Sequence, residues 1–447
     1  MKLVQQVWNP RIVTAIIVGT IGLALTRSLV AQQVDYDRQW PQWRGPQANG
    51  VAPHASPPLV WNGEKNVRWK IPVPGEGIAT PIVWNEKVFV VAAVPTDRPA
   101  DTPVQPHDDA RTQPPNRYFQ FTVFCFNRQT GDTIWQRVAA ESVPREGHHV
   151  TNSYASGSPS TDGHRLYVSF GSHGMFCYSL DGDLLWQRDL GDMRTRRGWG
   201  EAVTPAIAND ALIVNWDQED DSSLIALDAA TGDVKWQVPR DEPTTWTTPL
   251  IVSRAGKTQI IVNGQNRVRS YDAANGEVLW QCGGQTVNPI PSPIADRDTV
   301  YCFSGYQGAA GYAIPLDAQG DVTETNRVRW HHHENTPYVP SPILYDGQLY
   351  FTRANNGILT SLRASDGTVV FGPERIPGVS NLYASPVAAA DRIYFTSREG
   401  VTTVIQPGSE LKVLATNELG EPVDASPVPV GKQLLIRSTT HLYCIEE

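Results

Sequence analysis

The fold is decided by a stretch that reads Ala226-Leu227-Asp228-Ala229-Ala230-Thr231-Gly232-Asp233-Val234-Lys235-Trp236, and residues 270–280 repeat its pattern. A strand ends at the Asp, the Gly supplies the positive φ of a turn, and an outer strand delivers the Trp. We predict that this ring packs between neighbouring units, which is worth roughly 2–3 kcal/mol for each ring. The equivalent positions along the chain are Trp69, Trp135, Trp186, Trp236, Trp280 and Trp330, with Phe371 and Leu414 as weaker substitutes.

A second repeated mark is a Ser or Thr followed by Pro. Pro lacks an N–H, so a Pro at one fixed place in every unit indicates a strand with an unpaired edge, such as the innermost strand of a propeller blade. Crowding at the shared axis explains the small residue before it. Hairpins and alternating strands such as 390–396 follow each mark. The eight copies are Thr80-Pro81, Ser158-Pro159, Thr204-Pro205, Thr248-Pro249, Ser292-Pro293, Ser341-Pro342, Ser385-Pro386 and Ser426-Pro427.

These repeats predict an all-β, eight-bladed β-propeller with four-stranded antiparallel blades. Only three strands fit after Pro427, the last over 441–445, while 67–73 is an outer strand without a blade of its own. We therefore expect the N-terminal strand to complete the last blade, which leaves no long exposed sheet edge. The predicted organisation is a signal peptide over 1–31, a lead-in segment over 32–61 and the propeller over 62–447. Residues 95–118, rich in Pro and polar residues, are predicted to form an inserted surface loop, either functional or merely tolerated.

The N-terminus has the features of an export signal. Lys2 and Arg11 precede the apolar run 12–25, and the small-residue ending at Ala31 suits a signal peptidase. An uncleaved anchor is the alternative, although the run is shorter than a membrane span requires. Cleavage makes the formal net charge of −9 more negative by three, which disfavours nucleic acid as a partner. We expect an exported, periplasmic or extracellular monomer without a stable membrane span.

The five cysteines are odd in number and show no Cys-x-x-Cys spacing, so neither a disulfide framework nor a zinc site is indicated. Cys125, Cys177 and Cys444 stand between large apolar neighbours, where a thiol acts as a small hydrophobic group. We expect core thiols, with one disulfide as the alternative.

With these marks in view, residues 62–447 resemble the quinoprotein-type propeller superfamily, which includes outer-membrane assembly factors of the BamB kind and the propellers of PQQ-dependent alcohol dehydrogenases. The Asp-x-x-Thr-Gly-x-x-x-Trp segments carry the resemblance, and the opening stretch 40–46, Trp-Pro-Gln-Trp-Arg-Gly-Pro, is similar to the start of secreted PQQ-repeat proteins. For such secreted proteins the resemblance implies a fold without a settled activity. In the dehydrogenases a flat, anionic quinone stacks on a Trp, and a calcium ion held by Glu, Asn and Asp polarises it. This chain lacks adjacent cysteines and the long loops of those enzymes, so PQQ with calcium is an alternative that we do not favour.

Propeller geometry places candidate ligand-binding side chains at one mouth of the central channel, just before each Pro mark. Trp199 or Trp246 is suited to stack on a flat ring or a sugar face, Glu201 to bind a cation, and Arg196 and Arg197 to clamp an anion. The alternative is that these residues only pack the loops around the axis. The full candidate set is Trp199, Glu201, Arg196, Arg197, Trp246, Asn152, Tyr338 and Tyr383.

Two further clusters are not predicted to bind metal. Side chains of consecutive residues on a strand alternate between its faces, so His331, His332 and His333 cannot all converge on one ion. The acidic run 217–221 lacks the spacing of a calcium loop. We assign no catalytic residue and no metal site. The favoured function is an exported non-catalytic binding or scaffold protein for a partner protein or saccharide; the alternative is a periplasmic PQQ-dependent alcohol or sugar dehydrogenase.

Overall fold

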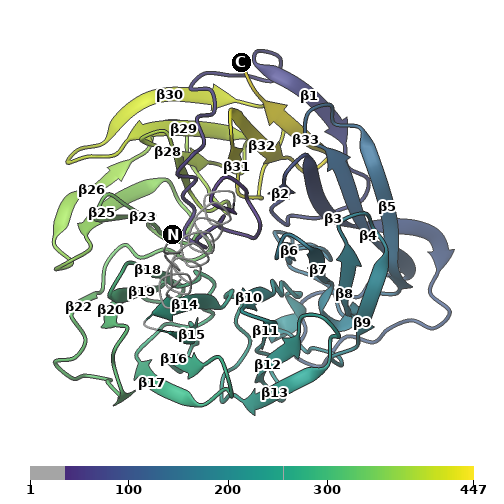
Figure 1. Ribbon diagram of the computed structural model, residues 1–447, viewed down its shortest axis with the longest axis horizontal. Coiled ribbons are helices and arrows are strands. Elements are labelled where there is room, and N and C mark those ends of the chain that lie inside the picture. Colours follow the sequence, from purple (N-terminus) through teal and green to yellow (C-terminus); the bar gives the residue numbers. More distant parts are fainter. Residues whose placement is uncertain (1–35, 255) are drawn as a thin grey trace, which may run out of the picture.

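A computed structural model describes residues 36–254 and 256–447. The predicted signal peptide, 1–31, lies outside the described residues. Within them, eight β-sheets surround one axis, and each contains four antiparallel strands of one blade (Figure 1). Among these residues no helix is long and apolar enough to cross a membrane. The predicted eight-bladed propeller is confirmed.

The strands run outward from the axis in chain order within each blade. Blades 1 to 4 contain β2 (Ile82–Trp84), β3 (Lys87–Pro99), β4 (Arg117–Asn127), β5 (Thr133–Ser142); β6 (Ser160–Thr161), β7 (Arg165–Ser169), β8 (Met175–Ser179), β9 (Leu184–Arg188); β10 (Ala206–Ala208), β11 (Ala211–Trp216), β12 (Ser223–Asp228), β13 (Val234–Pro239); and β14 (Leu250–Arg254), β15 (Lys257–Val262), β16 (Arg267–Asp272), β17 (Val278–Gly283). Blades 5 to 7 contain β18 (Ile294–Ala295), β19 (Thr299–Ser304), β20 (Ala310–Pro315), β22 (Trp330–His332); β23 (Ile343–Tyr345), β24 (Gln348–Thr352), β25 (Ile358–Arg363), β26 (Val369–Arg375); and β27 (Val387–Ala389), β28 (Arg392–Thr396), β29 (Val401–Gln406), β30 (Lys412–Glu418). The short strand β21 (Gly320–Asp321) adds in parallel to β17, and single 3-10 turns lie at Gly171–His173 and Arg196–Gly198.

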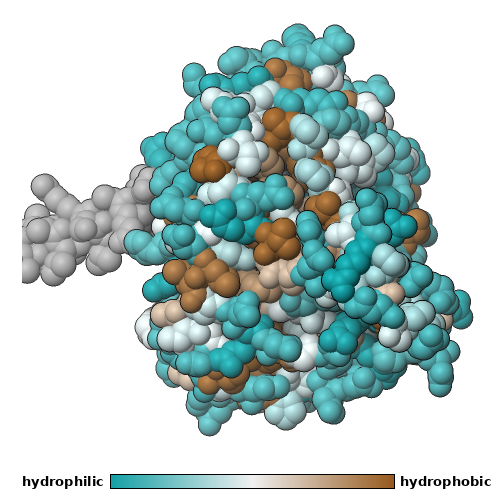
Figure 2. Space-filling view, turned by 90° about the vertical axis from the view of Figure 1, so that its right-hand side faces the viewer, coloured by the Kyte–Doolittle hydropathy of each residue, from teal (hydrophilic) through white to brown (hydrophobic). Residues whose placement is uncertain are grey.

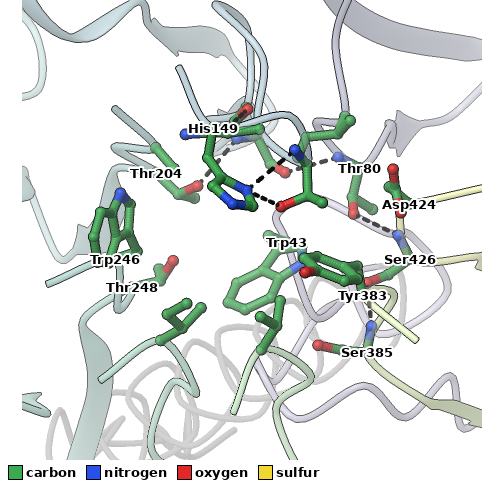
Figure 3. Close-up of a pocket in the computed structure, with 18 of the residues that line it drawn as sticks. Trp43, Thr80, His149, Thr204, Trp246, Thr248, Tyr383, Ser385, Asp424 and Ser426 are labelled. Atoms are coloured by element: carbon green, nitrogen blue, oxygen red, sulfur yellow. Dashed lines mark hydrogen bonds between the residues drawn. The ribbon is translucent and has the colours of Figure 1, made fainter. Parts of the chain in front are cut away.

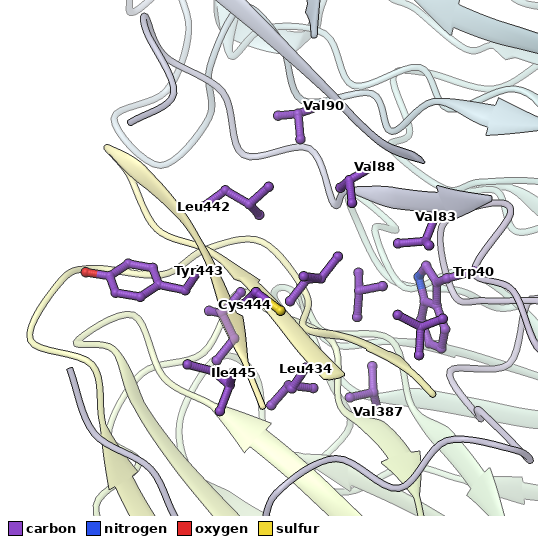
Figure 4. Close-up of a cluster of buried hydrophobic side chains, with 14 of the residues drawn as sticks. Trp40, Val83, Val88, Val90, Val387, Leu434, Leu442, Tyr443, Cys444 and Ile445 are labelled. Carbon is purple, nitrogen blue, oxygen red and sulfur yellow. The ribbon is translucent and has the colours of Figure 1, made fainter. Parts of the chain in front are cut away.

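Blade 8 closes the ring with strands from both ends of the described chain. It contains β31 (Val428–Val430), β32 (Gln433–Arg437), β33 (His441–Ile445) and, outermost, β1 (Val67–Pro72). In β1, Trp69 pairs with Cys444 and Lys70 with Tyr443. An apolar cluster fills the space between the closing blade and its neighbours (Figure 4). The predicted closure by the N-terminal strand is therefore confirmed.

Each Pro of the repeated mark stands one residue before an inner strand, as Pro205 does before β10. The missing N–H of the Pro thus falls where the chain enters the blade, at the axis, and no ladder bond is lost. Six of the eight residues before these prolines line the central cavity, the exceptions being Ser292 and Ser341.

The outer-strand tryptophans hold neighbouring blades together as predicted. The Trp186 indole N–H donates to the carbonyl of Ala229 in the next blade at 3.2 Å, and its ring covers Gly232, where a Cβ would lie only 2.6 Å from the ring. The same pair of contacts recurs for Trp69, Trp135, Trp236 and Trp330. Trp280 is buried too, but its Nε1 has no hydrogen-bond partner among the described residues. Phe371 is buried at the equivalent place in blade 6, where it pairs with Ser361. In blade 7 the equivalent place, opposite Val404, is occupied by Ala415, so the prediction of Leu414 is wrong by one residue.

The predicted insertion 95–118 overlaps two strands that project beyond blade 1. Strand β3 continues to Pro99 and β4 begins at Arg117, so the connection itself is 100–116. It folds against the loop 194–200, where the Arg111 N–H donates to the Arg197 carbonyl at 2.8 Å. The insertion therefore supports one side of the channel mouth.

The five cysteines are all buried and unpaired. Burial raises the pKa of the Cys125, Cys177 and Cys444 thiols to about 12, so they are inert core groups. The face in Figure 2 carries apolar side chains scattered among polar ones. The exposed apolar side chains of the described residues include Ile134 of β5 and Leu184 of β9. Apolar side chains scattered in this way are ordinary on protein surfaces.

Candidate binding site

A ring of hydroxyls surrounds the channel axis, contributed by the Ser or Thr before each Pro. In blade after blade, the backbone N–H of this residue donates to the hydroxyl of its counterpart in the next blade, as Ser341 does to Ser385 at 2.9 Å. Seven of the eight links are formed, at 2.8–3.2 Å, and the last of them runs from Ser426 back to Thr80. At these seven links the hydroxyl satisfies an N–H of the neighbouring blade, so Ser or Thr has a reason there beyond small size.

Among the described residues the eighth link, from the Thr204 N–H to the Thr248 hydroxyl, is not formed. Thr204 still accepts the N–H of Ser158, and Thr248 still donates its own N–H to Ser292. The gap leaves one backbone donor and one hydroxyl facing the channel between blades 3 and 4.

The position two residues before each hydroxyl forms a second ring, and all eight of its members line one cavity of about 310 Å³. Their side chains are of many kinds, in contrast to the uniform hydroxyl ring. They are Ile78, Ser156, Ala202, Trp246, Ile290, Val339, Tyr383 and Asp424. Trp246 and Asp424 belong to blades 4 and 8, which are opposite in the ring, and they lie on opposite sides of the cavity (Figure 3).

The lead-in segment closes one end of the channel. Its Trp40 bridges to Val83 in blade 1, Ala48 packs on the core between blades 4 and 5, and Val51 bridges to Ala388 in blade 7, so the segment crosses the axis (Figure 1). Arg44 is buried on this path and donates to the carbonyls of Pro342 and Pro386 at 2.5 and 2.8 Å. Trp43 lies beside it and lines the cavity.

Aromatic rings form most of the cavity wall. The Trp246 indole N–H donates to the Gly200 carbonyl at 2.8 Å, which fixes the plane of the ring, and its centre lies 6.4 Å from that of Trp199. Tyr306 and Tyr338 stack at 4.7 Å. The wall is rigid because these rings contact one another or are held by backbone groups.

The charged part of the lining is a neutralised pair. Arg398 donates to both oxygens of Asp424, at 2.6 and 3.1 Å, and its guanidinium lies 4.5 Å from the centre of the Tyr383 ring. His149, which contacts the edge of Trp199, also lines the cavity, and its burial together with Arg398 lowers its pKa. The site is therefore suited to an uncharged ligand.

Five of the eight predicted site residues line this cavity: Trp199, Trp246, Asn152, Tyr338 and Tyr383. Glu201 does not, because its carboxylate accepts the N–H and hydroxyl of Ser172 at 2.7 and 2.5 Å. Arg196 lies near Gln265, 3.4 Å away, and Arg197 lies 5.8 Å from the Trp199 ring; neither lines the cavity. The expected cation site at Glu201 and anion clamp at the arginines are thus not part of this cavity.

Glu201 instead forms a buried acidic pair with Glu146. Burial raises the pKa of Glu201 to about 8 and that of Glu146 to about 7, and repulsion by the Glu146 carboxylate adds to the rise at Glu201. Glu146 accepts hydrogen bonds from the N–H and hydroxyl of Thr195. The pair supports the loop that carries Trp199.

The cavity is also lined by residues that were not predicted as site residues from the sequence, among them Trp43, His149, Tyr306 and Asp424. The spacing would have found Asp424, which occupies the same place relative to Ser426 as Trp246 does to Thr248. Trp43 could not be found in this way, since the contacts of the lead-in segment span more than 290 residues of sequence.

The two clusters that were not expected to bind metal are occupied by protein contacts. His331 and His333 stack on one face of the strand, while His332 points to Phe351. Asp217 forms a buried bidentate pair with Arg240, and Asp220 pairs with Arg194. No group of three His, Cys, Asp or Glu side chains suited to a metal ion occurs in the described part of the chain.

The cavity does not fit a quinone held by calcium. The Asn152 side-chain oxygen accepts hydrogen bonds from the Ser153 N–H and the Ser156 hydroxyl, and the Asp424 carboxylate is paired with Arg398. The oxygen atoms that could coordinate a metal ion therefore already have protein partners. Glu201 points away to Ser172. Calcium needs six to eight oxygen ligands around one point, and this arrangement does not provide them.

Eight four-stranded blades around one channel, five of them joined to the next by a Trp–Gly contact, define a propeller of the quinoprotein type. Residues 120–373, more than half of the chain, match the family described as outer membrane protein assembly factor BamB, and the chain belongs to this family. No curated protein matches it.

Solved structures with the same architecture include BamB from Moraxella catarrhalis, with 12% identity, a TM-score of 0.52, and coverage of 79% of this chain and 100% of that one. A europium-containing methanol dehydrogenase has 10% identity, a TM-score of 0.62 and 91% coverage of both chains. A quinohemoprotein alcohol dehydrogenase from Comamonas testosteroni has 10% identity, a TM-score of 0.63, and coverage of 91% and 80%. At these identities the likeness establishes the fold alone.

Proposed function

We propose that this protein is an exported, non-catalytic binding protein that takes its ligand, a saccharide or a segment of a partner protein, into the channel cavity. One observation carries the proposal: the cavity is closed by the lead-in segment and lined by aromatic rings and hydroxyls, while its carboxylate is already paired with Arg398. A general base or nucleophile needs a free and suitably tuned group, whereas such a wall is suited to binding.

The family's description as an assembly factor of the outer membrane supports a location outside the cytoplasm. The predicted signal peptide over 1–31 is consistent with export. A PQQ-dependent dehydrogenase is the alternative suggested by the fold likeness, and the donor arrangement of the cavity argues against it.

The test is a titration of the purified protein, followed by tryptophan fluorescence, with three probes: linear neutral oligosaccharides, an extended aromatic-rich peptide, and PQQ with calcium. We expect the saccharide or the peptide to bind, and Trp246→Ala to weaken that binding at least tenfold, about 1.4 kcal/mol. Val369→Ser, on the exposed edge of β26, serves as the control that leaves binding unchanged. Dye reduction by alcohols or sugars in the presence of PQQ and calcium would contradict a non-catalytic role.

A further inference from the structure

We propose that the cavity binds the terminal ring of a neutral saccharide chain, with one face of the sugar on Trp246 and its hydroxyls at the gap of the hydroxyl ring and at Asp424. This inference rests on the proposed binding function and names its ligand class. A site for the terminal ring of a saccharide requires a flat apolar surface, polar groups beside that surface, and a channel that is closed at one end.

Trp246 provides the apolar plane. A pyranose ring has a face of C–H groups and a rim of hydroxyls, so it needs a flat apolar surface bordered by hydrogen-bonding groups. The Trp246 ring is fixed by its bond to Gly200, and Trp199 continues the aromatic wall beside it. Little conformational entropy is lost when a ligand binds to a side chain that is already held in place.

The gap in the hydroxyl ring provides the polar groups next to this plane. Thr204 and Thr248 both line the cavity, and Thr248 follows Trp246 by two residues. A sugar hydroxyl can accept the Thr204 N–H, which has no partner within residues 36–254 and 256–447, and exchange a second hydrogen bond with the Thr248 hydroxyl. A ligand would thereby complete the one link of the ring that is open among the described residues, and an unpaired N–H away from water is costly enough to favour this.

Asp424 provides acceptors on the opposite side of the cavity. A carboxylate has about four acceptor sites, and Arg398 uses one on each oxygen, so further hydroxyls can donate to it. Because Arg398 neutralises the charge, the pair favours an uncharged hydroxyl donor over a cationic group. An acidic sugar is disfavoured because its carboxylate would lose water without gaining a cationic partner, since Arg398 is already paired with Asp424.

Closure by the lead-in segment restricts the ligand to a chain end. Trp43 lines the cavity and Arg44 is tied to the prolines of blades 6 and 7, so a saccharide cannot pass through the channel. Only a terminal ring reaches Trp246, and the rest of the chain extends out of the mouth.

Calorimetric titration with linear di- and trisaccharides of glucose, galactose, mannose and N-acetylglucosamine tests the proposal. We expect at least one to bind, its cyclic counterpart without a chain end not to bind, and a uronic acid analogue to bind at least tenfold more weakly. Thr248→Val should weaken binding about five- to tenfold without changing the unfolding midpoint. Ser341→Ala is the matched control: it removes an acceptor of the hydroxyl ring outside the cavity lining and should lower the midpoint while leaving affinity unchanged.

Failure of all these saccharides to bind would overturn the inference, as would a cyclic saccharide that binds as well as the linear one. If only the aromatic-rich peptide binds, and Trp246→Ala weakens it, the saccharide inference fails while the proposed binding function stands. If no probe binds, both fail.

Discussion

The hydroxyl ring allows a matched test of what one of its links contributes. Thr204 and Thr248 occupy equivalent places, but only Thr204 accepts a backbone N–H within the ring, that of Ser158 at 3.0 Å. Replacing Thr by Val keeps the shape of the side chain and removes the hydroxyl. We expect Thr204→Val to leave the buried Ser158 N–H without an acceptor and to lower the free energy of unfolding by about 1–3 kcal/mol. Thr248→Val, which breaks no link, should change it by less than about 0.5 kcal/mol.

Guanidinium unfolding followed by tryptophan fluorescence measures the difference between the two variants. Hydrogen exchange by mass spectrometry then localises it, because the peptide containing the Ser158 amide should exchange faster in Thr204→Val alone. Equal losses of stability in the two variants, or unchanged exchange at Ser158, would refute the view that the hydroxyls act as acceptors and would leave crowding as the reason for their small size.

Three further predictions concern other contacts. Gly232→Ala should destabilise the protein by about 1–3 kcal/mol more than Gly347→Ala in thermal unfolding, since both glycines have φ above +70° but only a Cβ at Gly232 meets a Trp ring; equal effects would mean that φ alone matters. The carboxyl of Glu201 has a folded pKa of about 8, raised from 4.5, so the folded state binds the extra proton and stability is lost as pH rises towards 8. The stability of Glu201→Gln relative to the unsubstituted protein should therefore increase by about 1–3 kcal/mol from pH 5 to pH 9 in denaturant titrations, and a constant difference would contradict this. Arg44→Met removes the hydrogen bonds to the Pro342 and Pro386 carbonyls and should make the lead-in segment susceptible to limited proteolysis, whereas the control Arg38→Met, at an exposed position, should not. Equal cleavage of the two variants would show that Arg44 does not hold the segment.

The fold could be predicted from the sequence because each blade repeats the same short sequence motifs. The Asp–Gly–Trp segments specify a turn and an inter-blade ring within eleven residues, and the Pro mark fixes where each inner strand begins. Even the closure by β1 follows from counting strands at the two ends. These features depend on neighbours in sequence or on the next repeat, which a single chain displays directly.

The site could be predicted only where it follows the repeat. Trp246 and Tyr383 were found because they stand just before a Pro mark, and all such positions face the channel. Glu201 is close to such a mark, but its side chain turns to Ser172, and no local pattern sets that direction. Trp43 belongs to a segment whose partners are hundreds of residues away, so its place in the cavity depends on the assembled ring.

The residues that maintain the ring of blades are distinct from those that we propose to recognise a ligand. The hydroxyl position has the same chemistry in every blade, and in seven of the eight copies the hydroxyl satisfies the N–H of its neighbour. The side chain two residues earlier makes no such link, and its chemistry varies from the apolar Ile78 to the acidic Asp424. The two functions meet at blades 3 and 4, where the Trp246 indole bonds to Gly200 and joins these blades in place of the missing link. The open N–H and hydroxyl therefore lie beside the Trp246 ring, and this juxtaposition is why we propose blade 4 as the side of the channel that holds the ligand.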